Sequence, residues 1–225
     1  MNLLFDFTAR NKRELFDGIK DVLFLLGVGG MLIVSIGLIL GIFLFISSSD
    51  RIIKRNKFII ILNKILSVIT DTCRSIPFIV LIIALIPVTV ILVGTMLGRM
   101  AAIPALVISA APFFARIVSN SLKEVPTGTI EASKAMGASI PKIVLILLKE
   151  AMPSLVAGLT VMFVTLIGFI AAAGVVGAGG LGELAKLSAS RREYPMMFIS
   201  IGILLAIVFV IQFTGDFIAK KIDRR

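Results

Sequence analysis

The chain has 225 residues, 58% of them apolar, and a mean hydropathy of +1.09, which excludes an ordinary water-soluble domain because apolar usage there is nearer half. Its net charge of +10 is expected where basic residues flank membrane spans, so we expect membrane lipid as the solvent and no nucleic-acid partner. One cysteine, Cys73, and no histidine leave no disulfide framework and almost no ligands for a metal site, so we expect neither a metal nor a cofactor in this chain.

The first predicted elements are a charged tail, residues 1–21, and a span, residues 22–46. No ionisable residue occurs from Val22 to Ile46, and this run is too long for the apolar core of a signal peptide, ~7–15 residues. Four basic residues follow at once, as in a stop-transfer flank: Arg51, Lys54, Arg55 and Lys57. We therefore expect a retained first helix.

The second predicted span, residues 65–87, contains two charged residues and two prolines. Pro77 and Pro87 are expected to kink it. Asp71 precedes Arg74 by three residues, so on a helix the two share a face and neutralise each other near the membrane edge. An interfacial ion pair and a substrate contact are both open interpretations of this pair.

The third predicted span, residues 100–117, has a stripe of small residues at every fourth position: Ala101, Ala105 and Ser109. Gly37 and Gly41 form a similar pair in the first span. Small residues let helix backbones approach closely in lipid, so these stripes predict helix packing and say little about function.

The fourth predicted span, residues 153–173, is followed by a break. No charged residue occurs from Ala151 to Gly182, a run longer than one upright span. The break is predicted from glycines at Gly174, Gly177, Gly179, Gly180 and Gly182. Irregular backbone at membrane depth persists only against protein or a water-filled cavity, so this segment is expected to line or close a pathway. The last span is predicted over residues 196–217.

The distribution of basic residues predicts the orientation of these spans. Five spans place the termini on opposite sides, and the side of the N-terminal tail collects 8 of the 23 lysines and arginines. Since cytoplasmic loops are enriched in Lys and Arg, we expect a multi-pass protein of the cytoplasmic membrane with its N-terminus outside. The C-terminus and residues 123–150 are then cytoplasmic.

Residues 123–150 contain a candidate docking helix. Thr129 is expected to cap it, Glu131 to lie in its first turn, and Gly137 to end it. Ile130 and Met136 are candidate anchors for a partner, although an ordinary connecting loop is the alternative interpretation. The residues expected to contact the partner are Thr129, Ile130, Glu131, Ala132, Ser133, Lys134, Ala135, Met136, Gly137 and Ala138.

This segment resembles the EAA loop of binding-protein-dependent ABC importer permeases, in Glu131-Ala132-Ser133 followed by Gly137. Further segments are similar to the methionine-importer permeases within that family: the 25 residues from Arg74, AAPFFAR from Ala110, PTGTIEASKAMGAS from Pro126 and VGAGGLG from Val176. Two departures are the serine at position 133 and Lys149-Glu150, where the family has Leu-Pro. Pro153 is expected to take over that helix start.

The resemblance implies an all-α, single-domain type I ABC importer permease over residues 1–225 that moves D- or L-methionine by alternating access. It also implies a second copy of the chain, two ATP-binding subunits docked on the EAA loops, and an external substrate-binding lipoprotein. The chain has no G-x-x-x-x-G-K-[ST] motif. We therefore expect it to be no enzyme, with ATP and Mg bound by the partner subunit.

A pathway for a zwitterion with a thioether side chain is expected to be apolar, with a few hydroxyls and no fixed charge. The candidate pathway residues are Ser109, Thr160, Thr165, Gly174, Gly177, Gly179 and Gly180.

Alternative functions are an importer permease for another small solute (an osmoprotectant, a phosphonate or another amino acid), a secondary transporter, and a structural membrane subunit. A secondary transporter is expected to show inverted repeats and mid-membrane acids or histidines, and neither is evident in this sequence. A structural subunit leaves the EAA-like loop and the glycine-rich segment unexplained.

Overall fold

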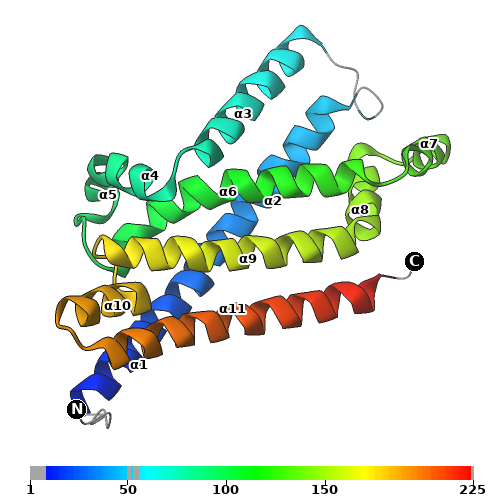
Figure 1. Ribbon diagram of the computed structural model, residues 1–225. Helices are drawn as coiled ribbons and strands as arrows, with labels where there is room; N and C mark the ends of the chain where they lie inside the picture. The colour runs from blue at the N-terminus through cyan, green and yellow to red at the C-terminus, as the bar shows by residue number, and fades with distance from the viewer. Residues whose placement is uncertain (1–8, 50–51, 53–55, 224–225) are drawn as a thin grey trace. The chain divides into compact units, whose positions relative to one another are not determined.

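The computed structural model describes residues 9–49, 52 and 56–223, and within these it is helical, with no strand. The first eight residues of the predicted tail lie outside this set. So do five basic residues that were predicted to lie on the cytoplasmic side: Arg51, Lys54, Arg55, Arg224 and Arg225. Figure 1 labels the helices, which are α1 Ala9–Phe24, α2 Gly30–Ser48, α3 Lys57–Ser75, α4 Phe78–Ala84, α5 Ile86–Val93, α6 Arg99–Lys123, α7 Thr127–Ala135, α8 Ile140–Glu150, α9 Met152–Val175, α10 Gly180–Ser190 and α11 Tyr194–Ile222. A π-helical turn, Leu25–Gly29, joins α1 to α2. The expected all-α class is confirmed.

Four helical stretches among the described residues are long and apolar enough to cross a membrane. They are Ala9–Ser48, Arg99–Lys123, Met152–Val175 and Tyr194–Ile222. The pair α3 and α4, bent by 107°, makes a fifth if it counts as one span. The expectation of about five spans therefore agrees with the helices observed.

The chain divides into two compact units. Unit 1 comprises residues 1–31, 77–107 and 163–211, and unit 2 comprises residues 32–76, 108–162 and 212–225. Both units draw on α6, α9 and α11.

In unit 1, α1 lies alongside α10 (Figure 1). Gly18 permits this approach, because a β-carbon there would stand 3.2 Å from the Leu181 side chain. Val22 and Leu181 are fully buried. Elsewhere in the unit the rings of Phe78 and Phe169 stack with centroids 4.7 Å apart.

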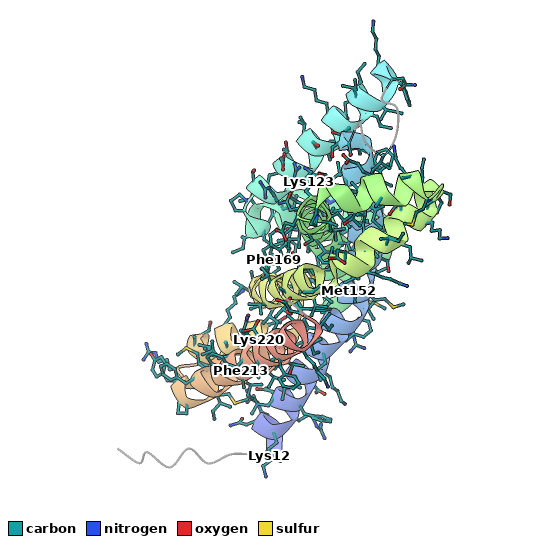
Figure 2. All side chains as sticks on the ribbon, turned by 90° about the vertical axis from the view of Figure 1, so that its right-hand side faces the viewer. Lys12, Lys123, Met152, Phe169, Phe213 and Lys220 are labelled. Carbon is teal, nitrogen blue, oxygen red and sulfur yellow. The ribbon has the colours of Figure 1, made fainter. Side chains whose placement is uncertain are left out.

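In unit 2, α2 packs against α6 through two of its glycines, Gly37 and Gly41. A β-carbon at Gly37 would stand 2.9 Å from the Ala111 carbonyl oxygen, and one at Gly41 would stand 2.6 Å from that of Ala115. The close backbone approach that the small residues predicted is thus present. On α11 of the same unit, Phe213 is exposed and projects from the helix (Figure 2), which suits contact with lipid.

The predicted second span is interrupted instead of kinked. Helix α3 ends at Ser75 and α4 begins at Phe78, after Ile76 has turned to extended backbone (φ −79°, ψ 127°). Proline disfavours helical backbone in the residue before it, so Pro77 ends one helix and starts another. Pro87 does not kink a helix either, since it occupies the first turn of α5.

The predicted irregular glycine-rich segment is short. Helix α9 extends to Val175 and α10 begins at Gly180, which leaves only residues 176–179 outside helices. Glu183 explains this early start, because its carboxylate accepts a 2.8 Å hydrogen bond from the Gly179 N–H, one of the donors that the beginning of a helix leaves unpaired.

Candidate functional site

Helix α7 of unit 2 begins three residues earlier than the sequence predicted, with Pro126 and not Thr129 at its cap position. It starts at Thr127, and Pro126 precedes it without a side-chain cap. Thr129 is therefore not the cap, and Glu131 lies beyond the first turn. The fixed φ of proline already suits a helix start, which explains the shift. Thr129 instead uses its carbonyl oxygen to accept a 2.7 Å hydrogen bond from the Ser133 hydroxyl.

Gly137 ends the short helix, as expected. Its φ is +72°, a left-handed conformation that glycine adopts without strain. The Ala138 N–H donates to the Ser133 carbonyl at 3.0 Å, and the Gly137 N–H donates to the Lys134 carbonyl at 2.9 Å. These two bonds form a Schellman motif, so the end of α7 is fixed by backbone geometry.

One side of α7 is turned toward its own chain. Ile130 is 5% exposed and Ser133 is 2% exposed. Ile130 lines a cavity of about 340 Å³ together with Phe45 and Leu122. Ile130 thus packs against its own unit, and its role as an anchor for a partner stays a prediction.

The other side of α7 is accessible, and we call it the α7 face: Glu131, Ala132, Ala135, Met136 and Ile140. Met136 is 77% exposed, and Ile140 at the start of α8 is also exposed. The small alanines between these apolar side chains leave room for another backbone to approach. Such a face suits insertion into a groove of a partner protein.

The segment that carries α7 is fixed to unit 2 on both flanks. Before α7, Glu124 accepts a 2.9 Å hydrogen bond from the hydroxyl of Ser154 on α9. After it, α8 buries Ile143 and Leu147 and is separated from α9 by a single residue, Ala151. A force applied to α7 therefore reaches helices α6 and α9 through packed structure.

The glycine-rich residues of unit 1 form a tight turn. The Gly98 N–H donates to the Gly177 carbonyl at 2.9 Å, and the ammonium group of Lys186 donates to the Val175 carbonyl at 2.7 Å. Gly177, Gly179 and Gly180 all have positive φ, and a β-carbon at Gly174 would stand 2.7 Å from the Glu183 nitrogen. Close packing and backbone conformation account for these glycines, and their role in a pathway stays a prediction.

The three candidate hydroxyl residues are divided between the two units. Ser109 and Thr160 are buried in unit 2, and Thr165 is half-buried in unit 1. The Thr160 hydroxyl donates to the Val156 carbonyl at 3.0 Å, and its side chain lies directly against Gly215 of α11. Thr160 thus contributes to helix packing, and a substrate contact by any of the three stays a prediction.

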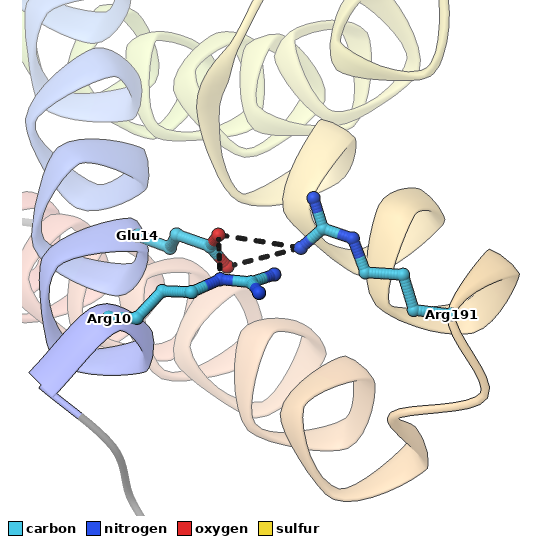
Figure 3. Close-up of polar contacts among 3 residues, drawn as sticks. All are labelled: Arg10, Glu14 and Arg191. Atoms are coloured by element: carbon cyan, nitrogen blue, oxygen red, sulfur yellow. Dashed lines mark hydrogen bonds and ion pairs between the residues drawn. The ribbon is translucent and has the colours of Figure 1, made fainter.

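An ion-pair network ties α1 to α10 in unit 1 (Figure 3). The Glu14 carboxylate accepts a 2.9 Å hydrogen bond from Arg10 and lies 3.4 Å from Arg191, which is 177 positions away in the chain. Glu14 lies before the apolar run that begins at Val22. The hydrogen bond from Arg10 lowers the pKa of the Glu14 carboxyl, and Arg191 adds to the effect.

Unit 2 contains a second charged group that sequence reasoning found only in part. Asp71 pairs with Arg74 at 3.5 Å, as expected, and it also accepts a hydrogen bond from Arg116 of α6. The available signal was an ionisable residue inside the apolar run of α6. Asp71, the partner of Arg116, lies 45 positions away in the chain, and only helix packing brings the two together.

The chain resembles known proteins over most of its length. The family described as binding-protein-dependent transport system inner membrane component matches residues 37–225. The probable D-methionine transport system permease protein MetI of Vibrio cholerae is 35% identical over 226 residues, which cover 100% of this chain and 99% of that protein. The methionine import system permease protein MetP of Bacillus subtilis is 46% identical over 165 residues, covering 72% and 74%. A solved structure of the MetNI methionine ABC transporter in inward-facing conformations matches with a TM-score of 0.88 at 40% identity, over 96% of this chain and 100% of that one.

Proposed function

Because the chain belongs to the family of binding-protein-dependent transport system inner membrane components, we propose that it is the permease subunit of an ATP-driven importer of D- or L-methionine. The substrate is supported by two relatives whose names state methionine transport and by the similar MetNI structure. Permeases for other small solutes are the alternative within the same class.

The α7 face is the observation that carries the transport mechanism. It presents Glu131 outward together with small and apolar side chains, while Ile130 and Ser133 face unit 2. We expect this face to seat in a groove of an ATP-binding subunit. ATP-driven closure of two such subunits then moves α7 as a rigid element and shifts the permease between its inward-open and outward-open states.

The proposed assembly contains two copies of this chain, two ATP-binding subunits and an external substrate-binding lipoprotein. ATP and Mg bind the ATP-binding subunits, since this sequence has no P-loop. In support, the similar MetNI structure is described as an ABC transporter, and the matched family is described as binding-protein-dependent.

We propose that the N-terminus is outside the cell and that α7 is cytoplasmic. The described part of unit 1 contains 8 lysines and arginines and that of unit 2 contains 10, the direction expected if unit 2 holds the cytoplasmic loops. Labelling of Lys134→Cys in a Cys73→Ser background tests this, because Lys134 is exposed whereas Ser133 is buried. Reaction with an impermeant thiol reagent in intact cells would contradict the orientation.

Uptake by vesicles tests the function. The chain is reconstituted with its ATP-binding subunits and binding protein, and labelled methionine is supplied outside with ATP inside. We expect accumulation that depends on ATP and on the binding protein and that excess unlabelled methionine abolishes. Uptake of a different solute without uptake of methionine would establish the alternative.

A further inference from the structure

Three charged side chains of unit 2 form a group that the coupling mechanism does not use. We call it the Asp71 cluster: Asp71 and Arg74 of α3 and Arg116 of α6. Asp71 Oδ2 accepts a hydrogen bond from Arg116, and Asp71 Oδ1 lies 3.5 Å from Arg74 Nε. One carboxylate thus faces two guanidinium groups, and the cluster carries a net positive charge.

The cluster lies at a depth where charge is costly in lipid. Arg116 is seven residues before the end of α6, or ~10 Å along the helix. Because α6 is ~37 Å long and the hydrocarbon core is ~30 Å thick, Arg116 lies ~7 Å inside the edge of that core if α6 is centred in it. An isolated arginine there extends toward the membrane surface. Arg116 turns to Asp71 instead, and its side chain is only 21% exposed. Charges held at this depth face a partner or water.

The cluster continues a polar stripe along α3. Steps of seven residues return to nearly the same side of a helix, and the stripe consists of Lys57, Lys64, Ser67, Asp71 and Arg74. The opposite side exposes Phe58, Ile65 and Ile69. A membrane helix that is apolar on one side and polar on the other contacts lipid with the first and water or protein with the second. Two exposed apolar residues, Ile60 and Val68, also lie on the stripe side, so it is the charged residues of the stripe that mark the wetted part of α3.

We propose that Arg74 and Arg116 receive the carboxylate of an amino-acid substrate in the translocation pathway, with Asp71 as the residue that positions both. This inference rests on the proposed function. Arg74 is 47% exposed, and among the described residues its guanidinium group makes the ion pair with Asp71 and no hydrogen bond. Its parallel N–H donors match the two oxygens of a carboxylate.

The Asp71 side chain is 45% exposed, but one of its two carboxylate oxygens is buried, which supports its positioning role. The Oδ1 atom of Asp71 is buried and accepts no hydrogen bond within the described chain. It therefore attracts Arg74 electrostatically and leaves the N–H groups of the Arg74 guanidinium available to a ligand. This proposal differs from the expectation of a pathway without fixed charge. A zwitterion presents a carboxylate as well as an apolar side chain, and a cluster with one surplus positive charge complements that carboxylate.

Displacement of labelled methionine tests the proposal. The permease and its ATP-binding subunits are placed in nanodiscs of neutral lipid, without the binding protein. The competitors are unlabelled methionine and 3-(methylthio)propylamine, which keeps the amine and thioether and lacks the carboxylate. For the wild type we expect methionine to compete at least ~10-fold better, the usual effect of a hydrogen bond to a charged group. Arg74→Gln should bind methionine ~10-fold more weakly and no longer distinguish the competitors.

Control variants separate this role from a structural one. Arg74→Lys should recover part of the discrimination, and Lys64→Gln, on the same side of α3, should behave as the wild type does. The inference would be overturned if Arg74→Gln bound methionine as tightly as the wild type and still distinguished it from the amine. It would also be overturned if a wild type that imports methionine showed no displaceable methionine binding. A defect that appears only in discs with anionic lipid would assign Arg74 to a lipid headgroup instead. Failure of wild-type vesicles to import methionine would refute the proposed function itself.

Discussion

Gly179 lies against Asp21 in unit 1, where a β-carbon on the glycine would stand 2.8 Å from the Asp21 Oδ2 atom. The same carboxylate pairs through Oδ1 with Arg99 at 3.1 Å, and that guanidinium group also stacks over the Phe24 ring at 4.6 Å. A glycine in the α9–α10 turn therefore allows a charged bridge between α1 and α6 to form.

Gly179→Ala is expected to destabilise the protein. The alanine would adopt φ 84° and ψ −170°, a region that is essentially restricted to glycine and costs ~1–3 kcal/mol for a residue with a side chain, and its methyl group would displace Asp21. The melting temperature, followed by circular dichroism of the purified protein in detergent, should fall. Gly202→Ala is the matched control, because Gly202 is helical and no atom lies within 4 Å of its β-carbon position. An equal melting temperature for Gly179→Ala and the wild type would contradict the prediction.

Glu14 is expected to make stability depend on acid pH. The pKa of its carboxyl is lowered by Arg10, so the charged form stabilises the folded state. That contribution is complete above the unfolded pKa of ~4.3 and is lost as the pH falls through the lower folded pKa. Glu14→Gln should therefore reduce the loss of melting temperature on acidification below pH ~5, whereas Asp17→Asn, exposed on the same helix, should retain it. Identical pH profiles for Glu14→Gln and the wild type would show that the ionised Glu14 carboxylate does not contribute to stability.

Gly137 is expected to be required for coupling through its backbone conformation. No atom lies within 4 Å of a β-carbon at this position, so the strain comes from φ alone. Gly137→Val should insert normally and lose most ATP-dependent uptake, because a β-branched residue strongly disfavours positive φ. Gly137→Asn is the control, since asparagine tolerates the left-handed region. If both variants lost uptake equally, contact with the partner and not the backbone turn would explain the glycine.

The polar stripe of α3 is expected to be wet. In a Cys73→Ser background, Ser67→Cys should react with a water-soluble thiol reagent, because Ser67 lies between the charged residues of the stripe. Ile65→Cys, on the exposed apolar side, should react at least ~10-fold more slowly, since thiolate reactivity needs water and lipid excludes it. Rates are measured by mass spectrometry of the assembled complex. Equal rates at the two positions would remove the argument for a wetted side.

The sequence by itself determined the features that depend on short stretches of chain. Long apolar runs located the membrane helices, since about 20 consecutive residues suffice to cross a bilayer. Gly137 indicated where α7 ends, because positive φ is a local property. The EAA-like loop indicated the family. Pro77 indicated an irregularity, although the sequence predicted a kink where the chain makes a break of 107°.

Only the tertiary structure decided which distant side chains meet. Arg116 pairs with Asp71 and Arg191 with Glu14, and Ile130 turns into its own unit and not outward. The physical reason is that hydropathy and turn signals fix where a helix lies along the chain but not its rotation about its axis against its neighbours. Close packing sets that rotation, as where Gly41 of α2 lies against the Ala115 carbonyl. The rotation then determines which charged side chains on neighbouring helices face each other.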